Sequence, residues 1–365
     1  MTSAHWPFCS TLHLYRPIMQ LYQKLCHALD NNEINELGLL PMIPEMCDVP
    51  PESQMYHPLI VVENKLGIAK QCLAILLKEA HEHFVALNEN DQQHLEQATR
   101  VMILLKPDNY TAINRRKQLI QSKYIQPKNE IALLELIFTI PKHSKSSIAW
   151  YHRQWIFAHY ADLDVENEFK LCTMTSMLYP RNYYAWTYRH WVLSNYCALD
   201  PARVEQEYKN TCQWIERNIS DFSGFQYLQQ VMEMHKGIRR ESHMQWLDTL
   251  IIRYPGHESL WCHRRFCSHL FVRSEVHCYE QHAFIENIMQ DVYKNQSLAL
   301  DNVSLQKEFA LKFGLFHLIM EKQAHGHIFA DASTAGLYLS VAPTPHFMDL
   351  QGGRTTEIKG NFECN

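Results

Sequence analysis

Apolar and aromatic residues recur along this chain with the three-and-four spacing of amphipathic helices. The range 92–105 carries such a stripe, and the range 66–84 predicts a helix that pairs with it. Five later segments align with one another at anchor positions 37, 36, 39 and 36 residues apart. The anchors are Ile113, Trp150, Trp186, Phe225 and Trp261. This regular step predicts a repeated structural unit.

Each unit contains the signals of a helix start. Four residues before the anchor stand Asn109, Ser146, Asn182, Asp221 and His257, and the first four can accept a hydrogen bond from free amides at a helix N-terminus. Prolines at 107, 180 and 255 separate this helix from the one before it. A second amphipathic helix follows each anchored helix, so each unit is predicted to be a helix hairpin.

Arginine stands three residues after the anchor in four of the five units, and Leu228 replaces it in the fourth. We interpret these arginines as braces between hairpins and the aromatic stripe as core. The residues in these structural roles are Trp150, Arg153, Trp186, Arg189, Trp191, Trp261 and Arg264.

A single hairpin cannot bury its own apolar face, so the units must stack. The predicted fold is all-α, a right-handed superhelix (solenoid) of antiparallel helix hairpins over residues 61–322. Residues 1–60 are predicted to hold a helix near 18–29 and an irregular Pro-rich segment. Residues 323–365 lack a helical period and are expected to form a flexible tail.

Composition narrows the class of protein. The chain has 365 residues, 46% hydrophobic residues and a formal net charge of -5, without a basic block that would indicate nucleic-acid binding. No apolar run is long enough to span a bilayer and no signal peptide is apparent, so we expect a cytoplasmic protein.

The 11 cysteines are scattered and include no CxxC pair, which favours reduced thiols. The nearest approach to a metal pattern is Cys262, His263, Cys267 and His269. On one helix their spacing does not form a closed tetrahedral set, so we expect ordinary helix residues and no metal bound by this chain.

The run Asn-Tyr-x-x-Trp-x-x-Arg-x-x-Trp is complete from Asn182 to Trp191 and resembles the repeat of protein prenyltransferase α subunits. Residues 58–67, 220–225 and 254–265 add to this resemblance, which covers roughly residues 60–320. Tetratricopeptide repeats, the competing class, need small residues at the helix crossing that these units lack.

The resemblance implies a crescent of helix pairs around a separate β subunit, similar to that of a Rab geranylgeranyltransferase. That subunit would hold the zinc ion and the lipid pocket. The partners implied are this β subunit, geranylgeranyl diphosphate and an acceptor protein with a C-terminal cysteine. A non-catalytic helical-repeat scaffold for protein–protein interaction is the alternative function.

The resemblance also implies site residues. Lys145 falls where the family places a lysine that reaches the diphosphate, and it precedes a helix N-terminus, which favours an anion. Alternatively it is a solvated lysine at the edge of a turn. Arg181, Asn182 and Tyr183 occupy the matching place in the next unit, where the family lines the subunit interface near the diphosphate. Alternatively Asn182 is a helix cap and Tyr183 a packing residue.

Overall fold

The structure, a computed structural model, describes residues 21–87, 91–235, 237–291 and 300–341. These residues form two compact units, one up to Asp200 and one from Pro201. Helices dominate both units, which confirms the predicted all-α class. Among the described residues, no helix combines the length and apolar composition needed to cross a membrane.

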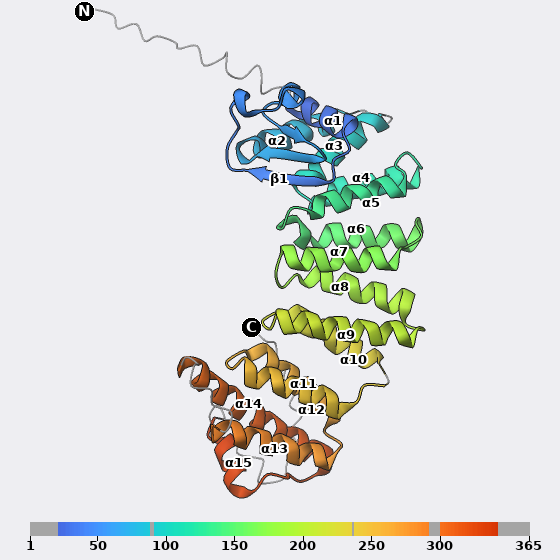
Figure 1. Cartoon of the computed structure of the whole chain (residues 1–365). Coiled ribbons are helices and arrows are strands. Elements are labelled where there is room, and N and C mark those ends of the chain that lie inside the picture. The colour runs from blue at the N-terminus through green and yellow to red at the C-terminus, as the bar shows by residue number, and fades with distance from the viewer. Residues whose placement is uncertain (1–20, 88–90, 236, 292–299, 342–365) are drawn as a thin grey trace, which may run out of the picture. The chain divides into compact units, whose positions relative to one another are not determined.

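The helices of the first unit stack one after another along the chain (Figure 1). They are α1 (Leu21–Asn31), α2 (Lys70–Ala86), α3 (Gln92–Leu105), α4 (Tyr110–Gln121), α5 (Pro127–Phe138), α6 (Ser147–His159), α7 (Val165–Leu178) and α8 (Tyr183–Val192), which a π-helical turn (Leu193–Cys197) extends. The anchored helices α4, α6 and α8 each pack against the helix before them. The hairpins are therefore α3–α4, α5–α6 and α7–α8, whereas the sequence analysis paired each anchored helix with the helix after it.

The anchored helices begin at the predicted caps. In the first unit the side-chain oxygens of Asn109, Ser146 and Asn182 each accept a hydrogen bond from the amide three residues on, at 3.1, 3.1 and 3.3 Å. In the second unit Asp221 does the same at the start of α10 (Phe222–Met234). His257 makes no such bond at the start of α12 (Glu258–Phe271).

A small sheet near the N-terminus was not predicted. Strands β1 (Glu36–Leu40), β2 (Ile60–Val62) and β3 (Lys65–Ala69) lie in the order β1-β3-β2, with β1 and β3 parallel. The helix expected from residue 66 therefore starts only at Lys70, and a boundary at residue 60 would cut through the sheet. The pairing of Leu37 with Leu66 joins residues far apart in the sequence, which local periodicity cannot reveal.

Buried arginines connect successive hairpins of the first unit. On α4, Arg116 places Nη2 2.6 Å from Glu130 of α5 and Nη1 3.2 Å from Glu96 of α3. On α6, Arg153 places Nη2 2.6 Å from Glu168 of α7. Both guanidinium groups are at most 2% exposed, so each is met by carboxylates of its own and of the next hairpin. We call this arrangement the arginine bridge.

The bridging carboxylates have a second set of partners. The residue two positions after the next anchor reaches back to them: His152 lies 2.8 Å from Glu130, and the Tyr188 hydroxyl donates to Glu168 at 2.7 Å. A buried ion pair is favourable only when further hydrogen bonds satisfy its remaining atoms. Each arginine bridge, together with these partners, ties four successive helices together.

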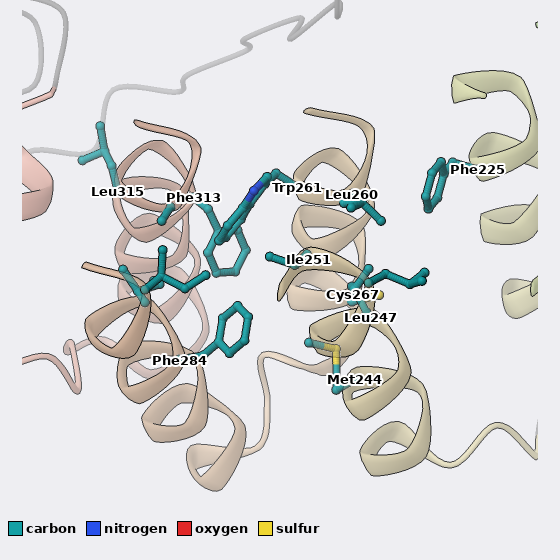
Figure 2. Close-up of a cluster of buried hydrophobic side chains, with 14 of the residues drawn as sticks. Phe225, Met244, Leu247, Ile251, Leu260, Trp261, Cys267, Phe284, Phe313 and Leu315 are labelled. Atoms are coloured by element: carbon teal, nitrogen blue, oxygen red, sulfur yellow. The ribbon is translucent and has the colours of Figure 1, made fainter. Parts of the chain in front are cut away.

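The second unit consists of helices around one apolar core. They are α9 (Pro201–Arg217), α10, α11 (Arg240–Arg253), α12, α13 (Glu275–Met289), α14 (Leu300–His325) and α15 (Ala332–Leu339). Figure 2 shows Trp261 of α12 facing Phe284 and Phe313, whose ring centroids lie 6.3 and 5.8 Å from its own. The guanidinium of Arg264 lies 3.9 Å from the Phe284 ring centroid and pairs with Asp248 of α11.

The chain beyond residue 322 differs from the expected tail. α14 continues to His325, and α15 packs on it through Tyr338, which is fully buried. A Cβ at Gly314 of α14 would lie 2.7 Å from the Tyr338 ring, so only glycine allows this close approach. The rest of the predicted tail, 342–365, lies outside the described residues, as do residues 18–20 of the first predicted helix.

Removing one member of an arginine bridge should destabilise the first unit strongly. Arg116→Leu leaves Glu130 buried without its ion-pair partner, which is expected to cost about 3–5 kcal/mol. Arg115→Leu, at the exposed neighbouring position, should change stability by less than about 0.5 kcal/mol. Urea unfolding followed by circular dichroism measures both. Similar transition midpoints for the two variants would show that the bridge contributes little.

The same bridge should make stability depend on pH. Burial alone would raise the pKa of Glu130, but Arg116 and His152 more than offset it and lower that pKa to about 2. Between about pH 4.5 and pH 2 the unfolded state therefore binds more protons than the folded state. The contribution of Glu130 to the free energy of unfolding is complete above about pH 4.5 and is lost toward pH 2. Urea unfolding between pH 6 and pH 2 should show a loss of roughly 2–4 kcal/mol. The Glu130→Gln variant should be less stable at neutral pH, and its free energy of unfolding should change less across this pH range. An equally steep pH dependence in the variant would contradict the role given to Glu130.

Candidate functional site

The turns before α4, α6 and α8 are joined side by side in the first unit. The side-chain amide of Asn182 donates to the carbonyl of Ser144 at 2.9 Å and to its hydroxyl at 3.2 Å. In the same way, the Ser146 hydroxyl in the turn before α6 donates to Asp108 in the turn before α4, at 2.6 Å. We call residues 106–109, 142–146 and 179–182 the capping edge.

Lys145 lies at the centre of this edge. It ends a short 3₁₀ turn (His143–Lys145) and immediately precedes Ser146, the cap of α6. Its side chain is half-buried, and Nζ lies 4.7 Å from the centroid of the Tyr179 ring, close enough for a cation–π contact. The sequence analysis did not single out Tyr179. Its place directly before Pro180 could have assigned it to the same turn of the next unit.

Arg181 adopts a costly backbone conformation. Its φ is +57°, in the left-handed region that side chains with a Cβ rarely occupy. The equivalent residue in the fifth repeat is Gly256, with φ +81°, which adopts such a conformation without that penalty. Keeping an arginine at a position suited to glycine costs about 1 kcal/mol or more, and its side chain is exposed.

Asn182 and Tyr183 differ in their surroundings. Asn182 is fully buried, and both ends of its amide are used, one to cap α8 and the other to hold the turn that leads to Lys145. Its position makes it a positioning residue. Tyr183 is 48% exposed and packs edge-to-face with the Tyr184 ring, so about half of its surface is open to a ligand or partner.

The charge of the capping edge favours anions. Its basic residues are Lys106, Lys142, Lys145 and Arg181, and its one carboxylate, Asp108, accepts from Ser146. His143 does not add to this charge near neutral pH, because burial lowers its pKa to about 4. The positive ends of α6 and α8 lie at the same edge. This arrangement can stabilise a polyanion such as a phosphate group.

The other repeat positions are mostly core. Trp150, Arg153, Trp186, Arg189, Trp261 and Arg264 are buried, whereas Trp191 is partly exposed against Tyr196. Arg189 donates to the carbonyl of Phe169 at 2.7 Å. Within the described residues, two groups of side chains hold metal-ligand atoms close together, and both belong to the second unit.

Three segments of the chain match a known repeat. A family model described as the protein prenyltransferase alpha subunit repeat matches residues 165–196, 204–235 and 241–271. These ranges contain the pair α7–α8 and nearly all of the pairs α9–α10 and α11–α12, so the sequence repeat and the structural hairpin coincide closely. Three hairpins of the chain are therefore similar to the protein prenyltransferase alpha subunit repeat.

Its relatives carry the same repeat in their names. Protein prenyltransferase alpha subunit repeat-containing protein 1 of Danio rerio is 28% identical over 318 residues, which cover 70% of this chain and 72% of that protein. The Homo sapiens protein of that name is 29% identical over 309 residues, 66% of this chain and 73% of the relative. Protein 1-A of Xenopus laevis is 28% identical, with 64% and 68% covered.

Because Asn182 bonds to Ser144 and also caps α8, it should contribute more to stability than a residue that only caps a helix. Asn182→Ala removes the cap and the two bonds to Ser144, at an expected cost of about 2–3 kcal/mol. Asn109→Ala removes the equivalent cap bond of α4 and should cost about 1 kcal/mol. Thermal and urea unfolding of both variants measure the difference. Equal costs would mean that the link to Ser144 contributes nothing.

Proposed function

We propose that the chain is the α subunit of a heterodimeric protein prenyltransferase. In this proposal it acts only with a β subunit, most simply one of the Rab geranylgeranyltransferase type, which supplies the zinc ion and the lipid pocket. The complex transfers geranylgeranyl from geranylgeranyl diphosphate to a C-terminal cysteine of an acceptor protein. The observation that carries the proposal is the basic capping edge, with Lys145 set against the N-terminus of α6.

The chemistry explains why a basic edge would be useful. The acceptor thiolate attacks C1 of the isoprenoid while the bond from C1 to the diphosphate oxygen breaks, so negative charge grows on the leaving group. Cations fixed beforehand stabilise this charge without reorganisation. Lys145 and Arg181 lie on neighbouring turns that Asn182 holds together. A diphosphate bound at the edge would accept from both.

Co-expression with a Rab-type β subunit tests the proposal as a whole. A stable complex that transfers labelled geranylgeranyl to an acceptor protein would support it. A stable complex that transfers neither geranylgeranyl nor farnesyl would instead favour a helical-repeat scaffold. The acceptor panel should consist of proteins with C-terminal cysteines, because the proposed reaction modifies that group.

Lys145→Ala should separate catalysis from folding. Removing one preorganised cation from the leaving group is expected to lower kcat by about 100-fold. Stability should stay within about 0.5 kcal/mol, because Lys145 is only half-buried. Transfer assays on the heterodimer and urea unfolding measure the two effects.

Lys128→Ala is the matched control. Lys128 is exposed in the first turn of α5, at the end of that helix opposite the capping edge. Its kcat should equal that of the unmodified complex. An unchanged kcat and kcat/KM for Lys145→Ala would remove Lys145 from the reaction, while leaving the subunit assignment to the co-expression test.

A further inference from the structure

The series of arginine bridges is interrupted in the second unit. Leu228 of α10 occupies the position that Arg116 and Arg153 hold in the first unit. The carboxylate position of the following helix is also changed, because α11 has His243 where α5 and α7 have glutamate. Both members of the ion pair are therefore replaced together, by neutral groups.

A compact cluster of ligand atoms takes the place of the ion pair. Nε2 of His243 lies 2.9 Å from Nε2 of His263, which in turn lies 3.7 Å from Sγ of Cys267. The three side chains are buried, and their ligand atoms all lie within 4.8 Å of one another. His263 and Cys267 are one turn apart on α12, so they share a face that meets α11. Figure 2 shows Cys267 beside Leu247 of α11.

The outer nitrogen of each ring has a partner that can fix its tautomer. Nδ1 of His243 lies 2.7 Å from the Tyr208 hydroxyl, and Nδ1 of His263 lies 3.4 Å from the Gln229 amide. The Gln229 atom that faces Nδ1 is the amide nitrogen, so the amide must turn over to present its oxygen as an acceptor. With that turn, each Nδ1–H donates to the oxygen of its partner, and both Nε2 lone pairs point into the cluster. Histidines that bind metals in proteins are oriented by such outer hydrogen bonds.

The rings are uncharged in this environment. Burial lowers the pKa of His243 to about 4 and moves the pKa of His263 well below its ordinary value, an effect to which His243 adds. Burial also raises the pKa of the Cys267 thiol. Near neutral pH the cluster thus presents two unprotonated imidazole nitrogens and one thiol.

We propose that His243, His263 and Cys267 bind a zinc ion that ties α11 to α12. Zinc takes nitrogen at about 2.0–2.1 Å and sulfur at about 2.3 Å, so tetrahedral ligand atoms lie about 3.3–3.6 Å apart. The observed nitrogen–sulfur separation of 3.7 Å already fits, and the two nitrogens must move apart by a few tenths of an ångström. Binding breaks the S–H bond of Cys267 and releases one proton, while both imidazoles stay neutral.

The fourth ligand position can bring the site to neutrality. A zinc ion with one thiolate carries a charge of +1, which is unfavourable in a buried site. A hydroxide formed from water in the fourth position, with release of a second proton, would make the site neutral.

A second cluster of possible ligand atoms lies in the same unit. It consists of Cys278, His317 and Glu321. Its carboxylate already accepts from His282, at 2.7 Å, and from the amide of Phe329, at 3.1 Å. The cluster around Cys267 instead offers two imidazole nitrogens and one sulfur, the ligand types that zinc prefers.

The proposed zinc site goes beyond the transferase function and needs no β subunit, so the full chain alone can be tested. The chain is stripped with a chelator and titrated with Co²⁺, which reports tetrahedral thiolate coordination by its absorption, and then with Zn²⁺. One equivalent of Co²⁺ should give a thiolate-to-cobalt charge-transfer band that Zn²⁺ abolishes. Stoichiometric Zn²⁺ should also raise Tm, because it binds only the folded state.

Variants locate the ion. Cys267→Ser and His243→Gln should each lose the band and the rise in Tm, with folding checked by circular dichroism. Cys262→Ser, on the same helix but outside the cluster, and Cys278→Ser, in the second cluster, should keep both. A titration of the unmodified chain without the band would overturn the proposal even if a variant failed to fold. A band that survives Cys267→Ser, or that depends on Cys278, would overturn it too.

Discussion

The buried guanidinium group is the constraint on which the first unit depends. An arginine carries five N–H donors and a permanent charge, so it is tolerated in a core only where acceptors meet it from several sides. Arg116 and Arg153 are each met by carboxylates of two different hairpins. The arginine bridge therefore fixes how one hairpin sits on the next, which hydrophobic contact alone specifies less well. This frame in turn aligns the helix starts that make up the capping edge.

Both proposed sites follow from departures from the repeat. At the capping edge, Arg181 keeps a side chain in a backbone conformation that the fifth repeat assigns to glycine. In the second unit, the loss of arginine at Leu228 coincides with the change of the partner position to His243. Both proposals therefore assign chemistry to positions where one unit departs from the residues that the other units use structurally. The transferase proposal and the zinc proposal rest on different units and can be tested separately.

The sequence predicted what depends on local pattern. The all-α class and the caps at Asn109, Ser146 and Asn182 are confirmed, because periodicity and capping act within one helix. Contacts between distant residues escaped it. The parallel pairing of β1 with β3, the packing of α15 and the link from Asn182 to Ser144 all join separate segments. The sequence analysis considered metal ligands within the α12 segment alone. His243, the third member of the cluster with His263 and Cys267, comes from α11.

The most direct test of this account is a double-mutant cycle on one bridge, Arg153→Met and Glu168→Gln, followed by urea unfolding. Arg153 of α6 and Glu168 of α7 belong to adjacent hairpins and meet at 2.6 Å. If the arginine bridge holds hairpins together, the coupling free energy should be about 2 kcal/mol or more. Additivity of the two single substitutions within about 0.5 kcal/mol would contradict it, and the hairpins would then be held by apolar packing alone.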